Sequence, residues 1–492
     1  MTRTRFNRAA APRLLHRFAP EPEARDTLPM LLQGGAEVYA LDDNGDTAVH
    51  AAAQAGNMAM LQTLFDYDRS GINLAGTDGT ALGIAAAANN SATLRLIIDA
   101  GADLNAPDKN GLTPLMRAWQ AGAFDTLQTL LQLGADIGAV NTDHKNILHM
   151  AAGANDVAAL DILLAGGGAA HLQSRMPSAD KLTPLHAAVR EGAEDAARVL
   201  IAAGANVNIP DAQNMTPLHS AAARNDVGMI YTLVCEGHAD IIRVENPAGY
   251  TALHTAIINK NEAAMRALCD LGADPHQIDN EKRTPLNIAG WNGFLPAIKY
   301  LMEEIPAEVA EEDALQSRTQ ALYDAVFYNH EDAADYLIAS GKVDLNRTTR
   351  HGDYVLIAAL QSGTSDMAEK LIAAGADVNT RNKDGMTPLL TCVMRNQVVA
   401  ANLLLLKGGD PNLSSPSTRL LHAAIARDYP FMVSLLLQNG ADPLQADGFG
   451  RGALDLARQQ GRANMVGEIE KAVLHFSNMK NQKPEGPAAP QV

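Results

Sequence analysis

Six histidines recur at one position of a repeated pattern, and imidazole is the side chain most often used for metal binding and proton transfer. They are His50, His149, His186, His219, His254 and His422. Each lies three residues after a predicted helix cap or its equivalent. Helices of neighbouring copies pack roughly 10 Å apart, whereas zinc holds its ligand atoms at about 2 Å. The six rings therefore cannot share one ion, and we predict that each forms hydrogen bonds near its cap that fasten adjacent turns.

The other residue types that support catalysis also follow the repeat pattern. The glycine run 166–168 lacks the Gly-Lys-Ser/Thr ending of a phosphate-binding loop, so we expect a flexible finger there. The cysteines are odd in number and form no close pair, which predicts buried thiols in a reducing compartment: Cys235, Cys269 and Cys392. No Ser, Cys or carboxylate pair departs from the pattern. We therefore predict no catalytic residue, no cofactor and no metal.

The repeated pattern is Thr-Pro-Leu-His, which is clearest at residues 183–186 and 216–219. Thirteen copies align on the leucine position, at steps of 32 to 37 residues: Val49, Leu82, Leu115, Leu148, Leu185, Leu218, Leu253, Leu286, Leu322, Leu356, Leu389, Leu421 and Leu454. A fixed period with small insertions predicts a linear stack of one supersecondary unit and not a single globular core.

The copy at residues 108–139 shows how one unit is built. Residues 108–111, Asp-Lys-Asn-Gly, form a predicted turn with an acceptor side chain first and Gly last. Thr113 is placed to cap a first helix, with Pro114 at its first position. A second, leucine-rich helix ends at Gly134, where glycine supplies the left-handed cap. Each copy is therefore expected to be a pair of helices followed by a loop.

These motifs resemble those of the ankyrin-repeat family, over roughly residues 26–475. The resemblance implies an all-α fold, an α-solenoid of ankyrin repeats in which helix-turn-helix units are joined by β-hairpin fingers. Three copies depart from the pattern, because repeats 4, 10 and 12 have Asn146, Tyr354 and Arg419 near the cap position. We expect weaker helix starts in these copies along the same path.

The order of the repeats predicts six segments. They are a basic N-terminal arm at 1–25, a half-repeat cap at 26–42, repeats 1–8 at 43–302, an acidic irregular joint at 303–318, repeats 9–13 at 319–477 and a disordered tail at 478–492. At the joint, acidic residues replace the Gly-Ala-Asp loop that follows other repeats, which suggests a short helical or irregular segment. We expect weaker coupling there between the two blocks of repeats.

Charge is distributed unevenly along the chain. The net charge is −17, but the first twenty residues contain five arginines and no acid, so the remainder carries −22. The repeats should therefore repel nucleic acid, and no nucleic-acid partner is expected. The basic arm is either a targeting or membrane-contacting segment, or a solvated arm or helix that covers the first repeat. Without an apolar run of about eighteen residues or a signal-peptide core, we expect a cytoplasmic protein.

Aromatic residues are only 4% of the chain, yet several fall at positions that the repeat leaves free. In ankyrin-like units, the finger tips and the residues after the second alanine position face outward on the concave side. The candidate partner-binding residues at or beside such positions are Tyr250, Arg283, Trp291, Asn292, Phe327 and Tyr328. Exposed aromatics of this kind usually mark a contact site. The alternative is that Phe327 and Tyr328 are buried under residues 303–318.

These observations predict a non-catalytic, monomeric scaffold that binds an unidentified protein partner through its concave groove and finger tips. Two other functions stay open. One is an enzyme or secreted effector whose site lies in the irregular segments 166–180 or 303–318. The other is a membrane-attached adaptor that uses the basic arm. Converging polar groups in a pocket at those segments would favour the enzyme.

Overall fold

The computed structural model describes residues 15, 28–34, 36–242, 247–303, 310–413 and 418–481. The chain forms two compact units, Met1–Ala256 with Ala263–Ala273, and Ile257–Glu262 with Asp274–Val492, called here the N-terminal and C-terminal units. This boundary differs from the predicted division at 303–318. The predicted arm, apart from Leu15, and residues 482–492 of the predicted tail lie outside the described residues, whereas 478–481 are helical.

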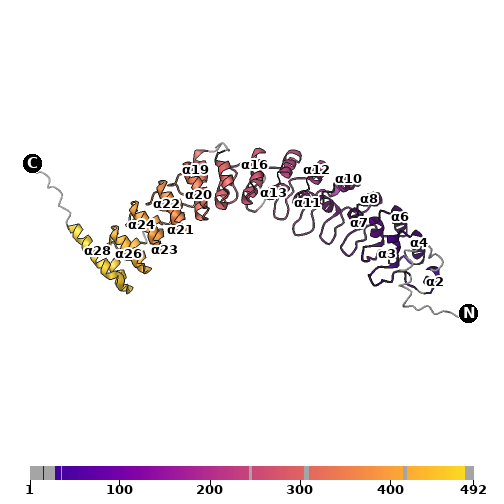
Figure 1. The fold of residues 1–492 in the computed structure, drawn as a ribbon, viewed down its shortest axis with the longest axis horizontal. Helices are drawn as coiled ribbons and strands as arrows, with labels where there is room; N and C mark the ends of the chain where they lie inside the picture. The colour runs from indigo at the N-terminus through magenta and orange to yellow at the C-terminus, as the bar shows by residue number, and fades with distance from the viewer. Residues whose placement is uncertain are drawn as a thin grey trace, which may run out of the picture. The chain divides into compact units, whose positions relative to one another are not determined.

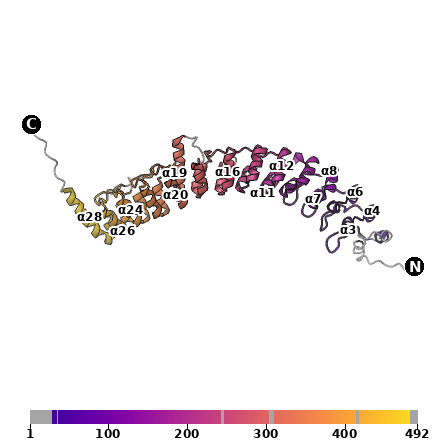
Figure 2. The ribbon, with the colours of Figure 1, turned by 45° about the horizontal axis from the view of Figure 1, so that its top comes forward.

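The N-terminal unit is a row of short helix pairs. Its helices are α2 (Leu28–Gln33), α3 (Ala48–Ala55), α4 (Met58–Tyr67), α5 (Ala81–Ala87), α6 (Ser91–Asp99), α7 (Pro114–Gln120), α8 (Phe124–Gln132), α9 (Ile147–Gly153), α10 (Val157–Ala165), the 3-10 helix η1 (Gly168–His171), α11 (Pro184–Glu191), α12 (Glu194–Ala202), α13 (Pro217–Ala223), α14 (Val227–Tyr231) and the π-helix η2 (Thr232–Glu236). Consecutive pairs lie side by side, and their long loops leave the same side of the stack in both views (Figure 1 and Figure 2).

The C-terminal unit continues the same pairing. Residues of both units occur in α15 (Ala252–Ile258) and α16 (Glu262–Asp270). The helices that follow are α17 (Pro285–Asn292), α18 (Leu295–Glu303), α19 (Glu311–Phe327), α20 (Glu331–Ala339), α21 (Val355–Ser362), α22 (Ser365–Ala373), α23 (Pro388–Arg395), α24 (Val398–Leu406), α25 (Leu420–Ala426), α26 (Pro430–Gln438), α27 (Ala453–Gln459) and α28 (Ala463–Asn481). The aligned residues are buried in both units except Leu454, which is half-buried, and the paired helices confirm the all-α solenoid.

Helix starts follow the cap residues of the sequence. The Thr183 hydroxyl accepts a hydrogen bond from the backbone N–H of His186 at 3.4 Å, and Pro184 is the first residue of α11. In repeat 4, Asn146 replaces the threonine and accepts from the N–H of His149 at 3.1 Å. The weaker start predicted for repeat 4 is therefore wrong, because asparagine is as good a cap as threonine. Repeats 10 and 12 do begin without a side-chain cap, at Tyr354 and Arg419.

The fingers are tight loops built on an acidic residue. The Asp108 carboxylate accepts the backbone N–H groups of Asn110 and Leu112, both at 2.8 Å, while Gly111 adopts a φ of 72°. An isolated antiparallel bridge joins Ala75 and Thr80, and the described fingers contain no longer strand. The β-hairpin fingers implied by the resemblance are thus turns in this chain.

The recurring histidines tie one repeat to the next, as predicted. The backbone N–H of Thr183 donates to Nδ1 of His186 at 3.3 Å, so Nε2 carries the proton and donates to a carbonyl of the following finger. The inter-repeat contacts through Nε2 include His50 with Leu74 at 2.9 Å, His149 with Leu182 at 3.0 Å, His186 with Met215 at 3.3 Å, His219 with Tyr250 at 2.9 Å and His422 with Arg451 at 2.9 Å. These rings fasten adjacent repeats, and at His186 and His219 the ring also bonds the threonine cap of its own helix.

Repeats 8 and 9 meet through an unusually close approach of α17 and α19. A Cβ added at Gly290 of α17 would lie 2.8 Å from Cα of Ala321. Asn287 replaces the histidine here, and its side-chain amide donates to the carbonyl of Ser317 at 2.6 Å. Repeats 8 and 9 therefore pack closely through these two helices, and the weaker coupling expected at 303–318 stays a prediction. Of the two forms predicted for the joint, the helical one holds for residues 311–318, which form the first turns of α19, and 304–309 lie outside the described residues.

Two further expectations about local structure are wrong. Cys235 is exposed on η2, although all three thiols were expected to be buried, and Cys392 is the buried one. The predicted flexible finger at 166–168 is partly ordered into η1, because Gly168 packs so closely on α10 that a Cβ there would lie 2.7 Å from the Leu163 carbonyl oxygen.

Candidate binding grooves

Three of the predicted contact residues converge in the C-terminal unit. Trp291 lies near the end of α17, and Phe327 and Tyr328 lie at the end of α19. The Trp291 and Tyr328 rings are 6.2 Å apart at 88°, and the Phe327 and Tyr328 rings are 5.2 Å apart at 78°. Such edge-to-face pairs hold aromatic rings in defined orientations. The three side chains form one cluster, called here the aromatic groove together with the residues that line it.

The aromatic cluster is open to solvent. Trp291 is 36% exposed, Phe327 40% and Tyr328 50%. The alternative that residues 303–318 bury Phe327 and Tyr328 is therefore wrong. The reason is that residues 311–318 extend α19 away from its own C-terminal end, where both rings lie. Large exposed rings in adjacent repeats make an apolar patch of the kind found at contact sites.

Arg283 lies beside this cluster, as predicted. Its guanidinium carbon is 5.9 Å from the centre of the Trp291 ring, within the range of a cation–π contact. Its Nε donates to the buried carboxylate of Asp279 at 2.8 Å, and its Nη1 is 2.8 Å from Glu281. Two carboxylates thus hold Arg283 against the ring face.

One face of α19 supplies the rest of the groove, and the sequence analysis did not predict it. The groove has a volume of about 510 Å³, and its lining adds Gln320, Tyr323 and Asp324 to the aromatic cluster. Residues 320, 323, 324 and 327 are spaced three or four apart and therefore share a helix face. The Tyr323 ring stacks on Phe327 at 5.9 Å and 9°. That spacing lies within the predicted repeat 9 and was a signal for these residues, but the sequence analysis did not use it.

Repeat 9 departs from the repeat pattern where the groove forms. Tyr323 follows Leu322 and so occupies the position that holds histidine in six other copies. Gln320 occupies the position of the capping threonine, but α19 has already begun at Glu311 and needs no cap there. Side chains that fasten the finger in other repeats are therefore available to line a surface here.

Burial changes the protonation of two groove residues. It raises the pKa of the Asp324 carboxyl to about 7, against weaker opposing effects of the Gln320 hydrogen bond and of Arg283 and Arg350. It also raises the pKa of the Tyr323 hydroxyl to about 12. Asp324 is thus a carboxyl group that changes charge near neutral pH at the wall of an aromatic groove.

The two remaining predicted residues have other surroundings. The Asn292 amide donates to the carbonyls of Ile257 and Ile258 at 3.2 and 2.8 Å, which commits it to packing within the unit. Tyr250 belongs to the N-terminal unit, where its ring stacks on His254 at 5.9 Å. Its carbonyl accepts the hydrogen bond from His219. Tyr250 and the aromatic cluster thus belong to different units, and the continuous face from Tyr250 to Tyr328 stays a prediction.

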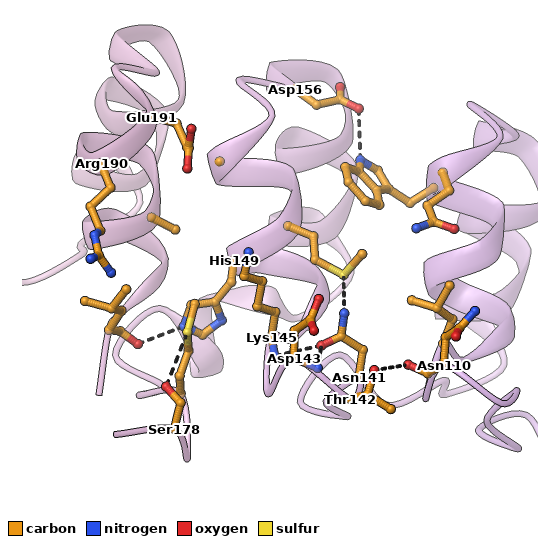
Figure 3. Close-up of a pocket in the computed structure, with 18 of the residues that line it drawn as sticks. Asn110, Asn141, Thr142, Asp143, Lys145, His149, Asp156, Ser178, Arg190 and Glu191 are labelled. Carbon is orange, nitrogen blue, oxygen red and sulfur yellow. Dashed lines mark hydrogen bonds between the residues drawn. The ribbon is translucent and has the colours of Figure 1, made fainter. Parts of the chain in front are cut away.

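A second and larger groove, of about 1170 Å³, lies in the N-terminal unit across repeats 3–5 (Figure 3). It is called here the polar groove, because charged and amide side chains dominate its lining, among them Asn141, Asp143, Lys145, Arg190 and Glu191. Its one tryptophan, Trp119, is half-buried, and the indole N–H donates to Asp156 at 3.0 Å. The sequence analysis did not predict this groove.

The polar groove includes part of the segment 166–180, where the enzyme alternative placed a hidden site. The Ser178 hydroxyl contacts the sulfur of Met176 at 3.9 Å, and the nearby His149 is engaged by Asn146 and the Leu182 carbonyl. Burial lowers the pKa of His149 to about 4, so the ring is neutral at pH 7. Ser178 and His149 are not hydrogen-bonded, as a nucleophile and its base would be. The described residues also hold no group of three His, Cys, Asp or Glu side chains that could bind a metal ion.

Comparison with known proteins agrees with this architecture. A family model described as ankyrin repeats (3 copies) matches residues 15–108, 70–141, 148–245, 218–313, 272–349, 322–415 and 355–447. The chain belongs to the ankyrin-repeat family. Its thirteen copies, helix caps and finger loops are therefore the repeats of that family.

Relatives of this ankyrin-repeat chain share its repeats at low identity. Transient receptor potential cation channel subfamily A member 1 of Homo sapiens is 23% identical over 436 residues, which are 86% of this chain and 36% of the relative. B-cell lymphoma 3 protein homolog of Mus musculus is 33% identical over 133 residues, 26% of this chain and 30% of the relative. L-asparaginase of Dirofilaria immitis is 31% identical over 168 residues, 34% of this chain and 28% of the relative. The chain spans about a third of each relative.

Across the described residues, none of the helices has the length and hydrophobicity that a membrane span requires.

Proposed function

We propose that this ankyrin-repeat chain is a non-catalytic scaffold that binds a partner protein through the aromatic groove of repeats 8 and 9, with help from neighbouring finger tips. The observation that carries the proposal is the exposed cluster of Trp291, Phe327 and Tyr328 in a chain with few aromatics. Three relatives whose names indicate a channel, a lymphoma protein and an asparaginase share its repeats, which supports a common role in interaction over a shared reaction.

The physical basis is a surface formed before the partner arrives. The rings are fixed by edge-to-face contacts, and Trp291 is held further by Arg283, so few rotamers are lost on binding. Tryptophan, tyrosine and arginine are also the residues that carry most of the energy of protein interfaces. We propose a cytoplasmic location as well, which the free thiols Cys269 and Cys392 support.

The test is affinity capture from a lysate of the source cells with the wild-type chain and with Trp291→Ala combined with Phe327→Ala. Partners of the groove should be captured by the wild type and lost by the double variant. For a purified partner, the double substitution should weaken binding by about 2 kcal/mol or more, because hot-spot side chains are removed. Both rings are exposed, so the melting temperature should change little.

The matched control removes two other apolar side chains from the same unit, Val399→Ala with Phe431→Ala, which are 78% and 80% exposed on α24 and α26. This variant should retain the partners. A large drop in melting temperature of the groove variant with unchanged capture would show that its aromatics support the fold and that the binding surface lies elsewhere.

A further inference from the structure

We propose that the aromatic groove receives a lysine or arginine side chain of the partner, and that the Asp324 carboxylate pairs with its positive charge. This inference rests on the proposed function, because it names the chemistry of the segment that the groove binds. It concerns only the C-terminal unit, in which all the groove residues lie.

Asp324 places a carboxyl group in the wall of the groove, where burial favours pairing of its negative charge with a cation. It is partly buried in the wall of the groove, and its side chain accepts one hydrogen bond, from Gln320 at 3.0 Å. Among the described residues, no Lys, Arg or His side chain lies within salt-bridge distance of it. Buried charges in proteins are usually paired, because desolvation disfavours the charged form. A cation from outside would supply the missing pair.

The rings around Asp324 suit the rest of a basic side chain. The Tyr328 ring stands at close to right angles to both Trp291 and Phe327, so the groove presents both ring faces and ring edges. Ring faces attract ammonium and guanidinium groups, and they pack on the methylene stems of Lys and Arg. The chain already places one guanidinium on this surface, since Arg283 lies over Trp291.

The charges around the groove favour a cation over an anion. The acidic groups that face it or act on it are Asp279 and Glu281 beside α17, Asp324 on α19, and Asp353 before α21. The basic groups are Arg283 and Arg350, with His351 on the rim. Arg283 is already held by Asp279 and Glu281, which leaves Arg350 as the cation that acts on Asp324 from a distance. With the carboxyls ionised, acids outnumber the two arginines, so an incoming basic side chain is favoured.

Protonation gives the proposal a signature that a purely apolar groove lacks. Burial holds the pKa of Asp324 at about 7 in the empty groove, and a bound cation must lower it. Binding therefore releases a proton, and affinity should rise as the carboxyl ionises. For a pKa of about 7 the ionised fraction grows roughly tenfold from pH 6 to pH 8, which sets the expected gain in affinity.

The experiment uses the full chain and a library of random twelve-residue peptides displayed on phage. Peptides that bind the wild type are screened against Trp291→Ala with Phe327→Ala, and those that lose binding are kept as groove peptides. Their affinities are measured by fluorescence anisotropy at pH 6 and pH 8 for the wild type, Asp324→Asn, Arg350→Gln and the control Asp366→Asn. An asparagine side chain resembles the protonated carboxyl in shape, and Asp366 is an exposed aspartate on α22.

Groove peptides should share a Lys or Arg and bind the wild type about tenfold more tightly at pH 8 than at pH 6. Asp324→Asn should lower the affinity for these peptides at least tenfold at pH 8 and remove its pH dependence. Arg350→Gln should raise the affinity for these peptides, because it removes a competing cation. The control Asp366→Asn should change the affinity less than twofold. A role of Asp324 in folding alone would not produce this pattern.

Groove peptides without a basic residue, or with equal affinity for Asp324→Asn, would overturn the inference and leave the proposed function standing. Acidic peptides that depend on Arg350 would overturn it as well. If no peptide depends on Trp291 and Phe327, the groove itself is not a binding site, and the proposed function fails with the inference.

Discussion

The polar groove of the N-terminal unit and the aromatic groove of the C-terminal unit are built on the same inner helices of the repeat, yet each uses its tryptophan differently. Trp119 lies four residues after the aligned leucine and donates its indole N–H to Asp156, the cap of α10. Trp291 lies five residues after its leucine and opens onto the groove with Arg283 on its face. One residue turns a side chain by about 100° around a helix. A shift of one residue along the helix thus separates Trp119, which bonds to the next repeat, from Trp291, which is exposed in the groove.

Gly290→Ala should produce the largest loss of stability, because it disturbs the close approach of α17 to α19 on which the aromatic groove is built. The added methyl group would meet the backbone of Ala321, which cannot move as a side chain can. We expect the free energy of unfolding to fall by about 3 kcal/mol, at the upper end of overpacking costs, and peptide binding to the aromatic groove to weaken with it. Thermal and chemical denaturation measure the first effect.

The control for that substitution is Gly467→Ala in α28, where an added Cβ meets no atom within 4 Å. Alanine is the better helix former, so this change should leave stability unchanged or raise it by up to about 1 kcal/mol. Equal losses for both glycines would mean that the approach of α17 to α19 is not tight.

The two units should respond to pH in opposite directions between about pH 4 and 7. Burial lowers the pKa of His149 from 6.5 to about 4, so the unfolded N-terminal unit binds more protons and its stability rises with pH through this range. Burial raises the pKa of Asp324 from 3.8 to about 7, so the folded C-terminal unit binds more protons and its stability falls with pH. For His149 we expect a change on the order of 1–2 kcal/mol.

The two tryptophans allow this contrast to be measured in one molecule. In Trp291→Phe the fluorescence of Trp119 reports on the N-terminal unit, and in Trp119→Phe that of Trp291 reports on the C-terminal unit. Denaturation at pH 5 and 7.5 should give opposite shifts. The shift of the N-terminal unit should become smaller in His149→Gln, where His186 still has a pKa lowered by burial, and that of the C-terminal unit should become smaller in Asp324→Asn. Shifts unchanged by both substitutions would contradict the assignment.

Trp119→Phe should give the smallest effect, about 1 kcal/mol of stability, because it keeps an aromatic ring and removes one hydrogen bond to Asp156. Binding of groove peptides should not change. If Trp119→Phe lowered the affinity for those peptides, the polar groove would take part in recognition, and the contrast between the two tryptophans would not hold.

The sequence predicted what the repeat determines locally. Helix starts at residues such as Thr183, the buried leucines and the histidine contacts depend on neighbours within one period or one repeat away, so their spacing identified them. The cluster of Trp291, Phe327 and Tyr328 was found because its residues break the pattern. Tyr250 was grouped with them on the assumption that equivalent positions form one face, but it belongs to the other unit.

The residues that were missed depend on departures from the repeat. Asp324 and Tyr323 line a groove because α19 starts about three turns early, and the acidic residues without a loop motif left open whether 311–318 would be helical or irregular. Trp119 was passed over because its role depends on Asp156, one repeat further along. The sequence period predicts the structure that all repeats share. The role of a residue that departs from the pattern depends on its contacts with other repeats, which the period does not reveal.

Gly290 also bears on how such a chain can grow by duplication. In the other twelve copies the position four after the aligned leucine holds alanine or a larger residue, and only repeat 8 has glycine there. Gly290 packs against the long helix α19 of repeat 9. The backbone of Ala321 lies so close to Gly290 that there is no room for a side chain at that position. A recombination that copied or removed one of these repeats alone would bring a mismatched helix to that contact. We therefore expect repeats 8 and 9 to tolerate duplication or loss only as a pair, together with the groove that they share.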